Sequence, residues 1–442
     1  MLITGAELAD GRVRDVRVRD GTFTEVGQGL DPVAGERAID ARGRHLLPGA
    51  LDVHVHFREP GAGHKETWAT GSRSAAAGGV TTVVDQPNTD PPTVDGDALA
   101  AKIEHAAEQS LVDFGINGGV TADWDPDSLL DGDLLALGEV FLADSTGEMG
   151  IAADLFGEAV EAAAARDVPV TVHAEDETLF DESALEGDLG GVGTAATVDA
   201  WSAFRTAEAE AAAVERAVEV GTDAGGQLHI AHTSTPEGVD VVRSAAEEGA
   251  DVTCEVTPHH LFLSRENAGR LGTFGRMNPP LRSEERRTAM FERLREGEID
   301  VVATDHAPHT VAEKTAPLTE APSGVPGVET LYPLLLEAVR KGDLSLELVR
   351  DVVAANPAEI FGLERKGAIA EGADADFVLV DLTNPREIEA GALHSNCGWT
   401  PYEGWQGVFP ELTVVRGEVV YDRDPVTGAE AFGEPAGENV RQ

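Results

Sequence analysis

Short apolar runs alternate with longer stretches rich in Ala and Glu through the middle of the chain. The apolar runs predict buried strands at 81–85, 115–118, 139–143, 168–173, 228–232, 251–256 and 300–304. The stretches between them predict helices, for example at 156–166 and 207–220. Repeated strand–helix units of this kind are typical of a (β/α)8 barrel of the TIM type, so the predicted fold class is α/β.

Both ends of the chain carry short strands and turn signals instead. In the first segment, valines at 13, 16 and 18 lie between the turn pairs Asp10-Gly11 and Asp20-Gly21. The last segment has apolar runs at 376–381 and 412–421. Neither segment has enough strands to be stable alone. We therefore expect residues 1–45 and 366–442 to form one small composite β-domain, with the barrel at 46–365.

Composition narrows the setting in which the protein works. No stretch of about 18 apolar residues occurs, so we expect no membrane span. The segment after Met1 lacks the basic and apolar regions of a signal peptide. The two cysteines, Cys254 and Cys397, are far apart and give no metal-binding spacing. A reduced, cytoplasmic location is the simplest interpretation.

The charge is extreme. The formal net charge is −47, with 80 acidic residues against 33 basic ones, and the acids are spread along the whole chain. Their sign excludes a nucleic-acid surface. At molar salt the Debye length is only about 3 Å, so self-repulsion of this size is screened. We interpret the charge as an adaptation to very high salt, and we expect the protein to lose stability at low salt.

Two histidines close the first predicted barrel strand. His54 and His56 point to the same face of a strand, where both imidazoles can reach one metal ion. Arg58 follows at the next position on that face. A guanidinium beside a metal indicates a site for a small substrate that carries a carboxylate. A bare His-x-His is usually structural, and Arg58 argues against that interpretation.

Other predicted strands also end on polar residues. Asn88 follows one strand, His173 and His232 end two more, and Asp305 follows the last. Because the carboxyl ends of barrel strands meet at one face, we expect these side chains to converge as a metal centre. Imidazoles favour zinc or a similar divalent ion, which lowers the pKa of bound water to about 7. Asp305 can bind metal and also carry a proton to a leaving nitrogen, which indicates hydrolysis or closure of an amide.

Six motifs resemble those of the dihydroorotases of the amidohydrolase superfamily. They are HVHFREPG at 54–61, QPNT at 86–89, VHAED at 172–176, CEVTPHHLFLS at 254–264, MNPPLR at 277–282 and ATDHAPH at 303–309. The resemblance runs from about residue 44 to 363, and the flanking β-domain also fits. Hydantoinases and allantoinases share the two-histidine opening and the barrel. The REPG run with Arg58 is the part that resembles dihydroorotases in particular.

The resemblance implies a role for each matching residue. One metal would be held by His54, His56 and Asp305, and a second by His173 and His232. Arg58, Asn88 and His309 would hold the substrate carboxylate, whereas Asn278, Ser323 and Gly324 would contact the ring amide. The implied reaction is the reversible cyclisation of N-carbamoyl-L-aspartate to L-dihydroorotate in pyrimidine synthesis, by metal-bound hydroxide with Asp305 as proton shuttle. His259, His260 and His306 lie near these motifs, and we expect them to be structural.

The sequence departs from the family at one metal ligand. Many dihydroorotases bridge two ions with a carboxylated lysine, in a segment that 137–149 matches with Glu139 in the lysine's place. None of the five lysines lies between 103 and 313. Glu139 has the right charge but a side chain roughly 3–4 Å shorter. We predict Glu139 as a ligand of one or two zinc ions, with Asp144 as a second candidate and a mononuclear site as the remaining alternative.

Two other functions stay open at this point. One is the hydantoinase or allantoinase type of cyclic amidohydrolase, and Arg58 argues against it. The other is a non-catalytic scaffold that has lost its metal and binds a partner such as aspartate carbamoyltransferase. The intact ligands argue against decay. We expect a small-molecule substrate with carboxylates, neither nucleic acid nor membrane as partner, and a chain that can form a homo-oligomer.

Overall fold

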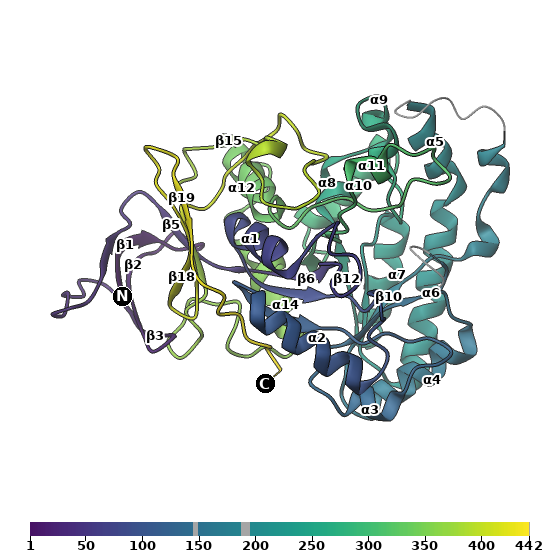
Figure 1. The fold of residues 1–442 in the computed structure, drawn as a ribbon, viewed down its shortest axis with the longest axis horizontal. Coiled ribbons are helices and arrows are strands. Elements are labelled where there is room, and N and C mark those ends of the chain that lie inside the picture. Colours follow the sequence, from purple (N-terminus) through teal and green to yellow (C-terminus); the bar gives the residue numbers. More distant parts are fainter. Residues whose placement is uncertain (145–148, 187–194, 442) are drawn as a thin grey trace.

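The structure is a computed structural model that describes residues 1–144, 149–186 and 195–441. In this part of the chain, eight parallel strands form a barrel (Figure 1). They are β6 (Ala50–Val55), β7 (Val80–Asp85), β8 (Asp113–Ile116), β9 (Leu137–Phe141), β10 (Val170–His173), β11 (Leu228–Ile230), β12 (Val252–Val256) and β13 (Val301–Val302). One ladder joins β6 to β8 and another joins β9 to β13. Parallel bridges of Gly118 with Leu137 and of Val55 with His306 close the ring. The predicted α/β barrel is confirmed.

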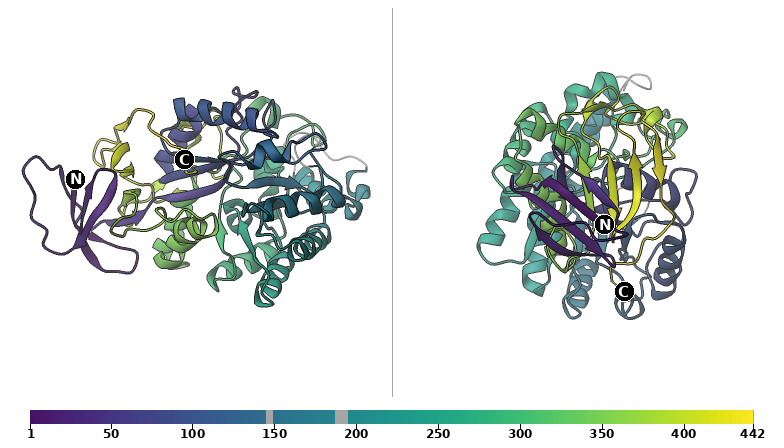
Figure 2. Two further views of the ribbon diagram at one scale, coloured as in Figure 1. Left: turned by 90° about the horizontal axis from the view of Figure 1, so that it is seen from below. Right: turned by 90° about the vertical axis from the view of Figure 1, so that its left-hand side faces the viewer.

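Helices surround these strands on the outside of the barrel (Figures 1 and 2). The longer ones are α1 (Trp68–Gly78), α2 (Gly96–Gln109), α4 (Ala153–Ala164), α5 (Ala195–Phe204), α6 (Ala207–Ala224), α7 (Pro236–Glu247), α10 (Glu284–Arg295) and α12 (Leu331–Lys341). The shorter ones are α3 (Pro126–Leu130), α8 (Pro258–Phe262), α9 (Ala268–Leu271), α11 (Val311–Lys314), α13 (Leu346–Arg350) and α14 (Asn356–Ile360). Local sequence sets their ends. Thr67 and Thr70 form a capping box at the start of α1, and Gly79 ends that helix in the left-handed conformation.

The two ends of the chain share one nine-stranded sheet, which lies beside the barrel (Figure 1). Its strands are β1 (Leu2–Glu7), β2 (Val13–Arg19), β3 (Thr22–Gly27), β4 (Ala38–Asp40), β5 (His45–Pro48), β14 (Phe377–Val380), β17 (Leu412–Val415), β18 (Glu418–Arg423) and β19 (Glu430–Phe432). The two ends are joined by the antiparallel pairing of β5 with β14, and also by a bridge between Thr22 and Asp374. The sheet has its own apolar cluster, which includes Ile3, Val16, Phe23 and Phe377. Strand β5 then leads directly into β6, so the sheet is anchored to the first barrel strand.

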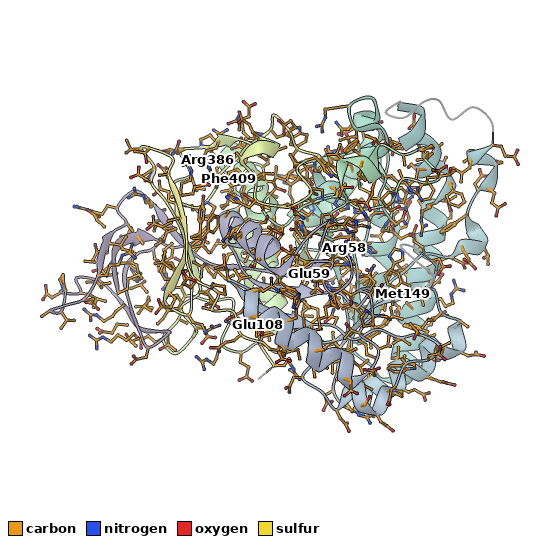
Figure 3. The ribbon with its side chains drawn as sticks, viewed as in Figure 1. Arg58, Glu59, Glu108, Met149, Arg386 and Phe409 are labelled. Atoms are coloured by element: carbon orange, nitrogen blue, oxygen red, sulfur yellow. The ribbon has the colours of Figure 1, made fainter. Side chains whose placement is uncertain are left out.

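The segment between β14 and β17 leaves this sheet and packs on the barrel. It carries the short strands β15 (Arg386–Glu387) and β16 (Gln406–Gly407). The Arg386 guanidinium lies 4.3 Å from the ring centre of Phe409 (Figure 3). Further along, Trp399 Nε1 donates to the carbonyl oxygen of His309 at 2.7 Å. A C-terminal segment therefore reaches the end of the barrel where the predicted site residues lie. Among the described residues, no helix is both long and apolar enough to cross a membrane.

Candidate active site

One cavity at the carboxyl ends of the barrel strands brings most of the predicted residues together. It is lined by His56, Arg58, Asn88, Glu139, Phe141, His232, Asn278, Asp305, Ala307, Ser323 and Gly324. His54 and His173 are buried and contact this lining. Figure 3 shows Arg58 over the barrel part of the molecule, away from the β-domain. His309 does not line the cavity, and lies behind Arg58 with its Nε2 3.4 Å from Arg58 Nη2.

Four donor atoms at this end have the spacing of a metal site. His54 Nε2 and His56 Nε2 lie 3.7 and 3.0 Å from Asp305 Oδ1, and 3.3 and 3.8 Å from Glu139 Oε2. Zinc binds nitrogen and oxygen at about 2.0–2.2 Å, so two ligands of one tetrahedral ion are about 3.4 Å apart. The observed separations scatter around that value. His54 Nε2 is also buried and has no hydrogen-bond partner among the described residues, which suits a metal ligand.

The other oxygen of Glu139 faces the second predicted pair. Glu139 Oε1 lies 2.6 Å from His232 Nε2 and 2.8 Å from His173 Nδ1, and the two histidine nitrogens are 3.0 Å apart. These are hydrogen-bond lengths, shorter than the ligand spacing of a shared ion. The two oxygens of Glu139 thus serve the two halves of the site, as a bridging carboxylate would. The half with His173 and His232 must open for an ion to enter.

Each of three histidines is held from behind by an oxygen acceptor. His54 Nδ1 is 2.6 Å from Glu255, His56 Nδ1 is 2.7 Å from the amide oxygen of Asn88, and His173 Nε2 is 2.8 Å from Glu175. A carboxylate or amide oxygen accepts, so each of these nitrogens carries the proton and the opposite nitrogen is free to bind metal. His173 therefore presents Nδ1, whereas His54 and His56 present Nε2. Outer partners of this kind are a regular feature of metal sites.

Sequence reasoning missed two of these partners. Glu255 and Glu175 lie within the motifs at 254–264 and 172–176, which do not by themselves indicate a role for them. Glu255 also accepts from the backbone N–H of His232 at 3.0 Å, and Arg205 holds Glu175 with Nε and Nη2. For Glu175 a signal is present, because a charged residue two positions after a strand-end histidine in a buried run needs a partner. Glu255 lies inside the strand Val252–Val256 and has no histidine within two positions.

The pKa values of the site residues are shifted in the directions expected of a cluster that binds cations. Burial opposes charging of His54, but the carboxylates of Glu255 and Glu139 outweigh it and raise the pKa of His54 well above its usual range. In the same way, hydrogen bonds to Glu139 and Glu175 overcome burial and raise the pKa of His173 to about 9. Burial would raise the pKa of Glu139, but the surrounding histidines lower it well below its usual range. Protons therefore occupy this cluster where metal ions can replace them.

Backbone conformation also marks the site. Arg58, His232 and Asp305 have φ angles of 65°, 32° and 45°, in the left-handed region that non-glycine residues rarely adopt. All three line the cavity. Such conformations cost of order 1–3 kcal/mol each and persist where the surrounding structure imposes them. The strained backbone thus occurs at the residues whose side chains must point into the cavity.

The remaining candidates have structural partners. The carboxylate of Asp144 accepts from the backbone N–H of Gly150 at 2.7 Å, outside the donor cluster. His260 bonds Thr257 Oγ1 and the carbonyl oxygen of Pro279, which agrees with a structural role. Residues 145–148 of the segment that resembles the lysine-bearing one lie outside the described part of the chain.

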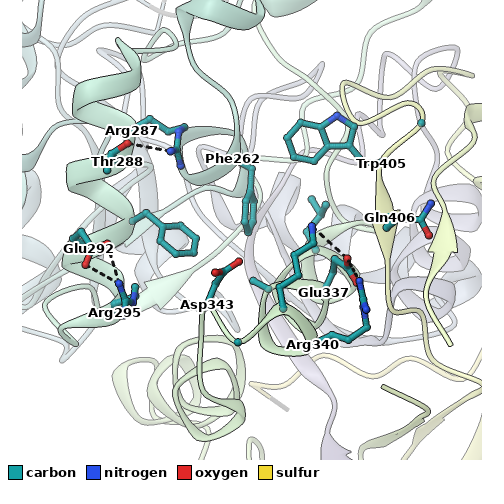
Figure 4. A pocket seen from close by; sticks show the side chains of 16 residues that line it. Phe262, Arg287, Thr288, Glu292, Arg295, Glu337, Arg340, Asp343, Trp405 and Gln406 are labelled. Carbon is teal, nitrogen blue, oxygen red and sulfur yellow. Dashed lines mark hydrogen bonds and ion pairs between the residues drawn. The ribbon is translucent and has the colours of Figure 1, made fainter. Parts of the chain in front are cut away.

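A larger cavity lies elsewhere. It has a volume of about 740 Å³ and lies between α10, α12 and residues 404–406 (Figure 4). Its cations are already paired, for example Arg295 with Glu292 and Arg340 with Glu337. None of the described residues that line it is a histidine. Size alone therefore does not locate the chemistry, and the smaller cavity with the metal donors does.

Comparison with known proteins agrees with this geometry. A model of the amidohydrolase family matches residues 45–420. The chain belongs to the amidohydrolase family. A dihydroorotase of Halobacterium salinarum is 64% identical over the whole of both chains. A dihydroorotase of Methanosarcina acetivorans is 44% identical over 96% of this chain and 91% of the relative. The resemblance inferred from the motifs is confirmed by these relatives.

Solved structures show the same architecture. An L-hydantoinase (dihydropyrimidinase) from Arthrobacter aurescens superposes with a TM-score of 0.92 at 30% identity, covering 99% of this chain and 98% of that one. A D-hydantoinase (dihydropyrimidinase) from Thermus sp. gives a TM-score of 0.89 at 27% identity, covering 100% and 98%. The family and the donor groups together support a divalent-metal centre in this amidohydrolase.

Proposed function

We propose that this amidohydrolase is a dihydroorotase, which reversibly cyclises N-carbamoyl-L-aspartate to L-dihydroorotate in pyrimidine (UMP) synthesis. One observation carries the choice of substrate. The buried guanidinium of Arg58 lines the same small cavity as His56 and Asp305. Dihydroorotate offers a ring amide to the metal side and a carboxylate to Arg58, whereas hydantoin and allantoin have no carboxylate. The identity with relatives named dihydroorotase supports the same choice.

The donor set of imidazoles and carboxylates suits zinc. His54, His56, Asp305 and Glu139 would hold one ion, and His173, His232 and Glu139 a second. When bound, a divalent ion lowers the pKa of a coordinated water and polarises the carbonyl that is attacked. Asp305 is the group placed to move the proton, because its Oδ1 is 3.0 Å from His56 Nε2 and its carboxylate lines the cavity. It takes the proton of the attacking water and passes it to the leaving ring nitrogen, and reverses these steps during ring closure.

The remaining lining residues orient the substrate. Arg58 binds the carboxylate as a two-pronged donor. Asn88 uses its amide oxygen on His56, so its amide nitrogen is the donor that can reach the same carboxylate. Gly324 has φ of 127°, and a Cβ there would lie 2.5 Å from the carbonyl oxygen of Ala307. Only glycine lets this loop lie so close to the cavity, where Asn278 faces the ring amide from another loop.

Turnover at molar salt tests the proposal. The purified protein is assayed with L-dihydroorotate, N-carbamoyl-L-aspartate, hydantoin and allantoin, and its metal content is measured in parallel. We expect turnover of the first pair and one or two equivalents of metal. Turnover of hydantoin or allantoin alone would instead assign it to the hydantoinase type, and absence of bound metal would favour a scaffold. Asp305→Ala should abolish turnover, whereas Arg58→Ala should mainly raise KM, with Arg58→Lys as the charge-matched control.

We further propose that the protein works in the cytoplasm of an organism that accumulates salt. The formal charge of −47 is dispersed, and both cysteines are buried and unpaired. Burial raises the pKa of Cys254 to about 12, so this thiol stays protonated and unreactive at neutral pH. The 64% identity with a relative from Halobacterium salinarum fits this setting.

A further inference from the structure

Lys65 lies beside the carboxylate side of the cavity, in the loop between β6 and α1. This loop turns back on itself, because the Ala62 N–H donates to the Arg58 carbonyl and the Lys65 N–H donates to the Ala62 carbonyl, both at 2.9 Å. The turn brings the Lys65 side chain, which is 19% exposed, close to Arg58. Its Nζ is 3.3 Å from Glu313 Oε1 and 3.2 Å from His309 Nδ1.

The hydrogen bonds of His309 fix where its proton sits. An ammonium group can only donate, so Lys65 makes His309 Nδ1 an acceptor. The opposite nitrogen, Nε2, lies 2.9 Å from the carbonyl oxygen of Ser323, which can only accept. These two neighbours therefore select the same tautomer, with the proton on Nε2. The longer contact of Nε2 with Arg58 Nη2, at 3.4 Å, then joins two donors and is not a hydrogen bond. Burial, followed by the charges of Arg58, Lys65 and Lys314, strongly lowers the pKa of His309, so this imidazole is neutral.

This arrangement links Lys65 to the wall of the cavity. His309 Nε2 holds Ser323, a lining residue, and lies against the guanidinium of Arg58. If the proton moved to Nδ1, then Nε2 would present a lone pair to the Ser323 carbonyl, and the two would repel. Glu313 keeps Lys65 in place, since its other oxygen is fixed by the capping box with Thr310 at the start of α11.

We propose that Lys65 is a positioning residue for the substrate carboxylate: it locks His309 as the Nε2–H tautomer, and His309 in turn sets Arg58 and Ser323 in the geometry that binds the carboxylate. The inference rests on the proposed dihydroorotase function for its kinetic consequence only. The tautomer is a property of the protein without substrate.

The first experiment compares Lys65→Met with the wild-type enzyme, using L-dihydroorotate at molar salt. Loss of one charge-assisted hydrogen bond should raise KM about tenfold or more and leave kcat within about twofold. Lys65→Arg, which keeps a cationic donor, should recover most of the affinity. Lys341→Met is the matched control, because Lys341 is an exposed lysine paired with Glu337 on α12. Unchanged KM in Lys65→Met, or equal effects in the control, would overturn the inference.

The second experiment reads the tautomer directly. Long-range ¹H–¹⁵N correlation spectra of the histidine-labelled protein distinguish protonated from unprotonated ring nitrogens, and His309→Gln identifies the His309 signals. We expect a single Nε2–H form in the wild type and a mixture in Lys65→Met. A lysine with only a structural role would leave the tautomer unchanged, which would refute the assignment. If the wild type does not turn over dihydroorotate, the proposed function fails, whereas the spectra still decide the Lys65–His309 contact.

Discussion

Replacing Glu139 by Gln tests whether one carboxylate serves both halves of the metal centre. The amide keeps the size of the side chain but removes its charge and one of its two acceptor oxygens. In the structure, Oε1 lies within 2.8 Å of both His173 and His232, and Oε2 lies 3.3 Å from His54. A change at this one position should therefore weaken the binding of both predicted ions, though not equally.

The expected magnitude follows from the ligands that remain. Without Glu139, one ion keeps His54, His56 and Asp305, a set with three protein ligands of the kind found in catalytic zinc sites. The other keeps only His173 and His232. Loss of an outer partner typically costs 10–100-fold in metal affinity. Loss of a direct ligand should lower the metal affinity at least about 100-fold, or about 2.7 kcal/mol. The second ion is affected more, because only two protein ligands remain for it.

The assay is metal content after dialysis against buffered molar salt, with turnover measured on the same samples. We expect two equivalents of zinc in the wild type, one in Glu139→Gln, and a loss of activity that follows the second ion. Asp144→Asn serves as the control, because that carboxylate binds the backbone of Gly150 instead. Two equivalents held with unchanged affinity by Glu139→Gln would refute the bridging role. A wild type that holds only one ion would refute it equally.

Three further predictions follow from particular groups. The pKa of metal-free His173 is raised to about 9, so zinc must displace a proton from this histidine at neutral pH. Zinc affinity should therefore rise about tenfold per pH unit up to about pH 9 and then level off. Competition titrations measure this, and a flat profile would contradict it. Lys314 is buried and donates to the carbonyls of Arg276, Pro322 and Gly324, so Lys314→Met should lower the free energy of unfolding by about 3 kcal/mol in urea titrations, unlike Lys341→Met. Thermal melts should shift upward between 0.1 and 1 M salt, where the Debye length falls from about 10 to 3 Å, and a salt-independent midpoint would show that the charge of −47 is not what limits stability.

The barrel was predictable because its strands are short, buried and bounded by turn residues. The exact ends of the strands were less predictable. The apolar run expected at 115–118 is the strand Asp113–Ile116, and the one expected at 139–143 is Leu137–Phe141. Both strands are buried along their whole length, so no alternation of polar and apolar residues marks where pairing begins. The segment from 384 to 410, which packs on the barrel next to His309, carries no periodic pattern that could have placed it there.

The metal donors were predictable for a related reason. His54, His173 and His232 lie at or within two residues of the ends of strands that must converge, and topology alone then brings them together. Their partner Glu255 was not predictable, because a buried acid within a strand looks the same in sequence whether it binds a ligand, a histidine or an arginine. Glu175, two residues after His173, could have been inferred from that histidine. Lys65 was hidden in the same way, since a loop lysine in a charged protein gives no sign that it faces an imidazole.

The short side chain of Glu139 is compensated by the backbone that carries it. A carboxylated lysine reaches further by roughly 3–4 Å, so a glutamate can take its place only where its strand lies close to the histidines. Gly138, the preceding residue, has φ of 129°, and a Cβ there would lie 2.3 Å from the carbonyl oxygen of Thr171 on β10. The absence of a side chain at Gly138 thus lets β9 approach β10 closely, and Glu139 meets all four histidines within 3.8 Å. The length of the Glu139 side chain is therefore not what limits binding of a second ion in this protein. Binding of the second ion is limited by the hydrogen bonds that join Glu139 to His173 and His232, because these bonds must be exchanged for bonds to metal. The two ions should therefore bind in order, with the half that contains His54 and His56 filled first.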